Sequence, residues 1–474
     1  MGPDHLLQPS QPQKWDPIEG FRLSLSGAVA QKELRFWSIL AVSSLAVAGI
    51  FALLLAISRL PGADSLFPWP VAFYERSLII HVIMSFVVWF VACGMIFAQI
   101  AAYRISDGTP RSENMGRTAA VALLAAFFLL GAPALMDSGV PSLNNYVPAI
   151  IDPIYYIGLL LVAFGAVMGA ARVFINLSNR QGALEPIGTS GITASVIVIL
   201  TIAAFAISWN HNGGMPNSPA ENEDVFWAGG HILQFFNVAI MIGAWLFLVG
   251  RIIGEPPVRP KVAMIAYGIL GLLALGGLLL LFVEEPLSVA ERDLFTQYQY
   301  ALAPVPTFIG LLVAAALIKA PKSETEVGRS AAVCVWLSMA LFFVGGFLGI
   351  FVDGTDTRTP AHYHAVIGAV NIALMGFLYL FVLPVLGRGI TKWRAVRASL
   401  WLYGLGQLLH SVGLFIAGGY GAPRKVAGTS PGLDVIGNWI GHVGIGIGGV
   451  IAVLGGVMFI WMCGKKLLKA SETN

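Results

Sequence analysis

The chain has 474 residues, of which 57% are hydrophobic and only 11% are charged, and its mean hydropathy is +0.78. This composition excludes a soluble globular protein and is typical of a chain that crosses a membrane many times. The net charge of +3 is spread over many short segments rather than gathered in one basic face, so we expect membrane lipid and no nucleic acid as partner.

Twelve apolar runs of about 20 residues follow one another along the chain, and each is long enough to span a membrane as a helix. They cover roughly residues 37–58, 77–102, 118–136, 151–171, 190–209, 225–250, 262–283, 299–318, 331–352, 361–386, 396–418 and 436–463. The sequence therefore predicts an all-α integral membrane protein, with an N-terminal tail over 1–36, a twelve-helix membrane domain over 37–463 and a C-terminal tail over 464–474.

The distribution of positive charge predicts the orientation of these helices. Most of the 28 Lys and Arg residues fall in the two tails and in the even-numbered loops. By the positive-inside rule, both termini then face the cytoplasm. The polar N-terminal tail has no apolar run of the kind that a cleavable signal peptide contains. We expect a multi-pass protein of the cytoplasmic (inner) membrane.

Histidines are concentrated in the predicted spans. Six of the eight lie there: His81, His231, His362, His364, His410 and His442. Ionisable groups are costly within a membrane and by default indicate function. With the alternating direction of the helices taken into account, all six fall in the outer half of the membrane, and such a layer is what a plane of metal cofactors requires.

The pair His362 and His364 opens one of the longest spans. Two residues advance a helix by about 200°, so these side chains point to opposite sides and one helix can ligate two cofactors. A low-spin haem needs two axial ligands on opposite ring faces. His81 and one member of the pair can supply them, while the other member can hold a second haem with an open sixth position.

This arrangement resembles the catalytic subunit I of the heme–copper oxidase superfamily, which includes cytochrome oxidases and nitric oxide reductases. Besides the twelve helices and the histidine of the second span, three motifs carry the resemblance: Trp227-Ala-Gly-Gly-His231, His362-Tyr-His364 and Gly419-Tyr-Gly-Ala-Pro-Arg424-Lys425. The resemblance implies a low-spin haem on His81 and His364 and a high-spin haem on His362. It further implies a non-haem metal on His231 and haem propionates paired with Arg424 and Lys425.

One departure from the family pattern concerns the non-haem metal. Where the family places two adjacent histidines at the outer end of the seventh helix, this chain has Glu284 and Glu285. Carboxylates suit iron better than copper. We therefore expect iron rather than copper on His231 with one or both glutamates. Gln234, three residues after His231 and on the same helix face, is expected as a further ligand or a hydrogen-bond donor. The glutamates would also deliver protons to the bound substrate.

A second departure concerns the substrate. Phe235 stands one turn after His231, where most oxidases of the family have a tyrosine that supplies an electron and a proton for splitting O2. The sequence therefore favours reduction of NO to N2O, with O2 reduction by a cytochrome c or quinol oxidase subunit as the alternative. Two haems, of b type, are expected, together with a separate electron donor: a cupredoxin-like or cytochrome c-like subunit, or quinol.

Other interpretations remain open at this point. A polytopic transporter with a histidine proton relay would also place histidines in apolar spans. A degenerate family member would keep haem and lose the gas chemistry. His410 and His442 match no family ligand, so we expect a structural role or hydrogen bonding on the propionate side, with an additional metal ligand as the alternative. Glu284 and Glu285 would also suit the membrane interface, and Arg424 and Lys425 would also suit lipid phosphate.

Overall fold

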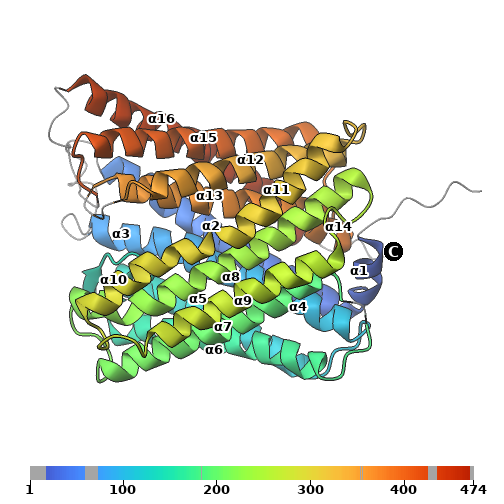
Figure 1. The fold of residues 1–474 in the computed structure, drawn as a ribbon, viewed down its shortest axis with the longest axis horizontal. Coiled ribbons are helices and arrows are strands. Elements are labelled where there is room, and N and C mark those ends of the chain that lie inside the picture. Colours follow the sequence, from blue (N-terminus) through green and yellow to red (C-terminus); the bar gives the residue numbers. More distant parts are fainter. Residues whose placement is uncertain are drawn as a thin grey trace, which may run out of the picture.

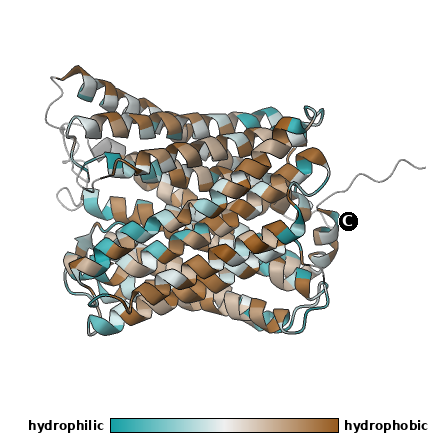
Figure 2. Ribbon diagram, in the orientation of Figure 1, coloured by the Kyte–Doolittle hydropathy of each residue, from teal (hydrophilic) through white to brown (hydrophobic). Residues whose placement is uncertain are grey.

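The computed structural model describes residues 18–58, 73–182, 184–352, 354, 356–424 and 435–469. Within these ranges, twelve helical stretches are long and apolar enough to cross a membrane, which confirms the predicted all-α membrane bundle. The spans lie side by side, and each runs between the two ends of the bundle. Helices α1 and α14 lie at one end, and α3 and α10 lie at the other (Figure 1). Hydrophilic residues gather at the two ends and hydrophobic residues fill the belt between them (Figure 2).

A short helix, α1 (Glu19–Ser24), precedes the bundle. Nine spans are single helices: α2 (Ala28–Ser58), α5 (Glu113–Leu135), α6 (Pro153–Leu177), α7 (Pro186–His211), α8 (Pro219–Ile253), α9 (Pro260–Leu280), α12 (Glu326–Gly349), α15 (Trp393–Gly419) and α16 (Ile436–Leu468). Three are composite: α3 (Phe73–Val82) with η2 (Ile83–Val88) and α4 (Trp89–Ile105); α10 (Val289–Tyr298) with η3 (Gln299–Leu302) and α11 (Pro304–Lys319); and α13 (Arg358–Phe377) with η4 (Leu378–Val382) and α14 (Leu383–Val385).

Local sequence explains where several spans begin. The Asp152 carboxylate accepts a hydrogen bond from the backbone N–H of Ile154, and Pro153 opens α6. In the same way, the Ser218 hydroxyl accepts from the N–H of Glu221, and Pro219 opens α8. A capping side chain satisfies an N–H that has no helical partner, and proline in the first turn costs no hydrogen bond, so both helices begin at these residues.

The composite spans depart from the predicted uniform helices. Two contain π-helical segments, and η2 begins two residues after His81. Such segments often occur at functional positions, because one extra residue per turn re-aims the side chains that follow. In the eighth span, the 3-10 turn η3 separates α10 from α11, which opens at Pro304. Proline cannot donate the hydrogen bond that would continue the α-helix through this point.

A small two-stranded ladder lies outside the prediction. β1 (Val140–Ser142) pairs antiparallel with β2 (Ala149–Ile151), with Val140 opposite Ile151. Three residues per strand are too few for a periodic pattern to show in the sequence. The ladder holds together the two ends of the loop 143–148, and most residues of this loop line the cavity described below.

Four of the six cavity histidines lie on the three spans that are most buried inside the protein. The spans Phe73–Ile105, Pro219–Ile253 and Arg358–Val385 have 83%, 94% and 89% of their most apolar window buried inside the protein, against 22% for the span Ile436–Leu468. These three central spans carry the four histidines for which the family resemblance implies metal ligation. The peripheral spans shield them from the membrane.

Candidate functional site

A single large cavity lies among the central spans, with a volume of about 1600 Å³. Pockets for one drug-sized ligand usually enclose about 300–1,000 Å³, so this space suits more than one large ligand. All six histidines of the predicted layer line it: His81, His231, His362, His364, His410 and His442. His211 ends α7 with its side chain exposed and does not line the cavity.

Backbone carbonyls orient several of these imidazoles. Nδ1 of His81 lies 2.9 Å from the carbonyl oxygen of Ala48 in α2, and Nδ1 of His362 lies 2.7 Å from that of Gly345 in α12. A carbonyl only accepts, so Nδ1 carries the proton and donates it, which leaves the lone pair on Nε2. Histidines that bind metal ions are usually held in this way by a hydrogen bond from their other nitrogen.

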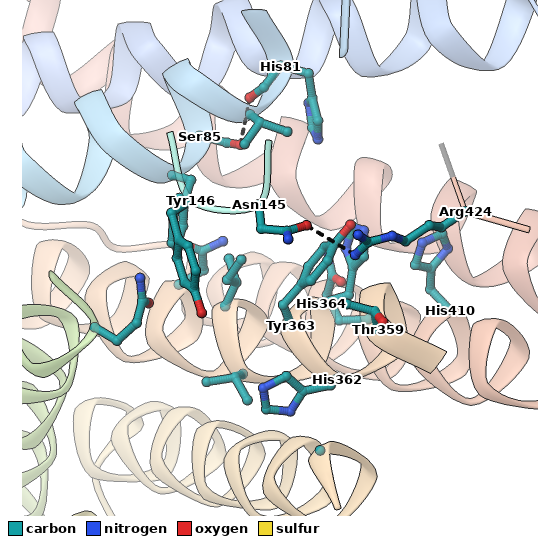
Figure 3. A pocket seen from close by; sticks show the side chains of 18 of the residues that line it. His81, Ser85, Asn145, Tyr146, Thr359, His362, Tyr363, His364, His410 and Arg424 are labelled. Carbon is teal, nitrogen blue, oxygen red and sulfur yellow. Dashed lines mark hydrogen bonds between the residues drawn. The ribbon is translucent and has the colours of Figure 1, made fainter. Parts of the chain in front are cut away.

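The two histidines of α13 contact different neighbours. His362 faces α12, where a Cβ atom added to Gly349 would lie 2.7 Å from its Nδ1. The ring of His364 lies 4.8 Å from that of His410 on α15, centroid to centroid, and His81 lines the same cavity. Figure 3 shows the two side chains leaving α13 on different sides, so the cavity reaches around this helix.

His231 has both ring nitrogens hydrogen-bonded within the protein. Its Nδ1 lies 2.9 Å from the carbonyl oxygen of Trp227 on its own helix, and its Nε2 lies 2.9 Å from the hydroxyl of Tyr146. Nδ1 must donate to the carbonyl, so Nε2 accepts the proton of the Tyr146 hydroxyl. Tyr146 comes from the loop between β1 and β2 and points its hydroxyl into the cavity (Figure 3).

Tyr146 is a site residue that sequence reasoning missed. It lies in a loop that follows no helical period, and nothing near it in the sequence resembles a motif. The motif Trp227-Ala-Gly-Gly-His231 held one indication of a close neighbour, its glycine at position 230. A Cβ atom on Gly230 would lie 2.4 Å from Cβ of Tyr146, so only glycine leaves room for this side chain. Burial and, secondarily, the negative charge of Glu223 raise the pKa of Tyr146, so its hydroxyl stays protonated and able to donate.

Arg424 also lines the cavity, as the sequence predicts for a residue that pairs with haem propionates. Its Nη1 donates to Oδ1 of Asn145 at 3.0 Å, and Nδ2 of Asn145 donates to Oε1 of Glu223 at 2.9 Å (Figure 3 shows the first bond). The guanidinium is thereby fixed at the wall of the cavity by the residue before Tyr146. Lys425 lies outside the described residues.

The structure does not bring the other predicted ligands to His231. Glu284 and Glu285 follow the end of α9, are exposed and do not line the cavity. Gln234 lines it, but its amide nitrogen donates to the carbonyl of Gly230 at 3.0 Å and its oxygen accepts from Asn237 at 3.3 Å. Helix α9 ends at Leu280, so the turn that follows it carries both carboxylates to the surface.

The donor atoms at the cavity therefore fit haem and do not fit a non-haem metal on His231. Haem iron needs one or two axial imidazoles, and His81, His362 and His364 offer them from two central spans. Even an open catalytic metal site generally uses three protein ligands. Across the described part of the chain, no group of three or more His, Cys, Asp or Glu side chains lies close enough to hold a metal ion.

The twelve described spans and the large cavity lined by six histidines fit a membrane oxidoreductase that holds haem inside its helix bundle. The chain matches the family model of cytochrome c and quinol oxidase polypeptide I over residues 34–451, and it belongs to this family, the subunit I of heme–copper oxidases. The resemblance seen in the sequence is confirmed. Membership makes the chain an oxidoreductase of a multi-pass membrane type, and the transporter alternative no longer applies.

Similar proteins span most of the chain. A heme-copper terminal oxidase dimer solved by cryo-EM matches 94% of this chain and 85% of its own, with a TM-score of 0.74 and 16% identity, a likeness of fold. An uncharacterized protein of Rickettsia prowazekii is 24% identical over 501 residues, covering 91% of this chain and 95% of its own length. One of Aquifex aeolicus is 29% identical over 359 residues, covering 73% and 83%.

Family membership also bears on cofactors and partners. Subunits of this family typically bind haems and a further metal centre, and they use donors such as cytochrome c or quinol with O2 or a related substrate. The haem side of this description agrees with the donor atoms at the cavity. The further metal centre does not agree with the donor atoms, because both ring nitrogens of His231 are hydrogen-bonded, one to the carbonyl of Trp227 and one to the hydroxyl of Tyr146.

Proposed function

We propose that this chain is the haem-bearing subunit of a terminal reductase in a respiratory or detoxifying chain, and that it reduces a small diatomic gas. His81 and His364 are the proposed axial ligands of a low-spin haem, and His362 is the proposed ligand of a second haem. The observation that carries the proposal is the convergence of these histidines on one cavity of about 1600 Å³. Two of them are already oriented by backbone carbonyls, as metal-binding histidines usually are.

The residues of the chain hold and orient the reacting groups. A haem held by His362 would supply the redox chemistry between ferrous and ferric iron that reduction of a gas requires. The carbonyls of Ala48 and Gly345 keep the imidazoles of His81 and His362 in one tautomer and one ring orientation. Arg424, fixed by Asn145, places positive charge at the cavity wall, where it would neutralise haem carboxylates.

The orientation and the electron donor belong to the same proposal. The distribution of Lys and Arg supports a chain in the cytoplasmic membrane with both termini inside the cell. The histidine layer then lies nearer the outer surface. A cupredoxin-like or cytochrome c-like partner, or quinol, would deliver electrons, because none of the three cysteines, Cys93, Cys334 and Cys463, belongs to a copper-binding pair or a haem-attachment motif.

NO is the first candidate substrate. Phe235, 2% exposed, occupies the position one turn after His231 at which most oxidases of the family carry a tyrosine. Reduction of two NO molecules to N2O needs two electrons and no phenol. The proposal does not use iron on Glu284 and Glu285, since both side chains are exposed and lie outside the cavity.

O2 is the second candidate, and one observation favours it. The Tyr146 hydroxyl lies 2.9 Å from Nε2 of His231 and points into the cavity, so a phenol is present although it comes from a loop rather than from α8. O2 reduction draws a proton and an electron from such a group in the family that this chain resembles.

Gas consumption tests the proposal. The purified chain in lipid nanodiscs, loaded with haem and supplied with a chemical reductant, should consume NO or O2 at an electrode. His362→Ala should abolish the consumption, and His211→Ala, at the exposed end of α7, should leave it unchanged. Consumption of neither gas by the haem-loaded chain would contradict the proposal.

A further inference from the structure

We infer that His231 is not a metal ligand in this protein: it forms a metal-free hydrogen-bonded pair with Tyr146, and haem iron is the metal on which the cavity relies. The inference rests on the proposed function for the haems but concerns a different position. It begins from the two ring nitrogens of His231, which lie 2.9 Å from the carbonyl of Trp227 and 2.9 Å from the hydroxyl of Tyr146.

The place where a metal would bind is taken by the hydroxyl. A metal ion on Nε2 lies about 2 Å away along the nitrogen lone pair, and that lone pair points at the Tyr146 hydroxyl. The ion would have to displace the hydroxyl or accept its oxygen as a ligand. In the second case, the site would still have only two protein ligands, fewer than the three of an open catalytic metal site.

Tyr146 is not free to swing aside. The Cβ atom of Tyr146 packs against Gly230, where an added Cβ atom would lie 2.4 Å from it. The rings of Tyr146 and Trp227 form a T-shaped pair with their centroids 5.5 Å apart. The preceding residue, Asn145, is held by both Arg424 and Glu223. These contacts fix the loop on both faces, so displacement of the hydroxyl would break several of them together.

Further donors are missing at this part of the cavity. The amide nitrogen of Gln234 donates to the carbonyl of Gly230, and its amide oxygen accepts from Asn237. Among the described residues that line the cavity, Asp293 is the only carboxylate, and its side chain is exposed. No group of three or more His, Cys, Asp or Glu side chains that could hold a metal ion includes His231 in the part of the chain that the structure describes.

The metal content of the purified chain tests this inference. The protein is expressed in medium supplemented with iron and copper salts and purified in detergent. Haem is measured as the pyridine haemochrome, and total iron and copper are measured by inductively coupled plasma mass spectrometry. We expect iron equal to haem and no stoichiometric copper. Iron in excess of haem, or copper near one per chain, that disappears in His231→Ala would overturn the inference.

Matched variants keep the test independent of folding. Tyr146→Phe keeps the ring that packs on Gly230 and Trp227 and removes only the hydroxyl, so its iron-to-haem ratio should equal that of the unaltered chain. Metal lost in this variant would show that the hydroxyl is a ligand and would also overturn the inference. A chain that lacks haem altogether contradicts the proposed function, whereas a third metal beside full haem contradicts only the inference about His231.

Discussion

Two single residues, His362 and His364, are the basis on which we propose that the two haems lie on different sides of α13. His362 is hydrogen-bonded to the carbonyl of Gly345 in α12, whereas the ring of His364 lies beside that of His410 in α15. Each histidine should therefore matter for one haem and not for the other. This separation follows from the two-residue spacing, which the sequence alone made visible.

Substitution of His362 and substitution of His364 should each remove a different component of the haem spectrum. His364→Ala should lose the low-spin component of the reduced-minus-oxidised spectrum and keep the component that binds carbon monoxide, and His362→Ala should do the reverse. His211→Ala is the control, because His211 is exposed at the end of α7 and does not line the cavity, so this variant should keep both components. Loss of the same component from both test variants would refute the assignment.

The residue scale also shows where prediction from sequence stopped. The six histidines were placed in one layer from helix direction alone, and all six line one cavity. The phenol beside His231 was missed, because Tyr146 reaches it from a loop 85 residues earlier in the chain. Glu284 and Glu285 were assigned to the site from their place after a helix, but the register of a helix end is set by packing, and both are exposed.

Among the helices, one buried ion pair joins two spans near the end of the bundle opposite to the histidines. Nη1 of Arg172 in α6 lies 2.6 Å from Oε1 of Glu33 in α2, and the two side chains are 3% and 11% exposed. Gly116 of α5 leaves room for the pair, since a Cβ atom there would lie 2.3 Å from the guanidinium. Loss of either partner would leave a buried charge without its counterion.

We therefore predict that Glu33→Gln destabilises the bundle by roughly 3 kcal/mol, measured by chemical unfolding in detergent micelles. The exposed pair of Arg329 and Glu326, 48% and 40% exposed, provides the control. Arg329→Gln should change stability by about 0–1 kcal/mol, because solvent screens exposed charges. Equal effects of the two substitutions would show that the buried pair does not hold α2 to α6.

The helices themselves were largely predictable, and their interruptions were not. Apolar length defines a span whatever its partners, so all twelve were found with bounds that differ by a few residues for most spans. The π-helical segment Ile83–Val88 and the ladder of Val140–Ser142 with Ala149–Ile151 arise from tertiary contacts. The predicted span 299–318 covers η3 and α11 and leaves out α10, because the sequence Val289–Tyr298 is too polar to continue an apolar run. The break before Pro304 had a visible cause in the sequence, since proline cannot donate the hydrogen bond that would continue the helix.

In the molecule as a whole, the most buried spans are the ones that carry the proposed haem ligands and His231. The three spans with the largest buried share carry His81, His231, His362 and His364, and the other spans enclose them. Hydropathy shows which helices exist but not which are central, because core and lipid-facing residues are equally apolar. The four histidines for which the family resemblance implies metal ligation lie on the most buried spans, whereas His410 and His442 lie on the less buried α15 and α16. All six line the cavity, as expected for polar groups that face the interior of a bundle.

The central claim is that one cavity holds two haems, and the haem content of the purified chain tests it most directly. The chain is expressed with the haem precursor 5-aminolevulinate, its protein concentration is fixed by amino-acid analysis, and haem is counted as the pyridine haemochrome. The account predicts two haems per chain, of which one binds carbon monoxide after reduction. A chain that folds and retains one haem or none would contradict it.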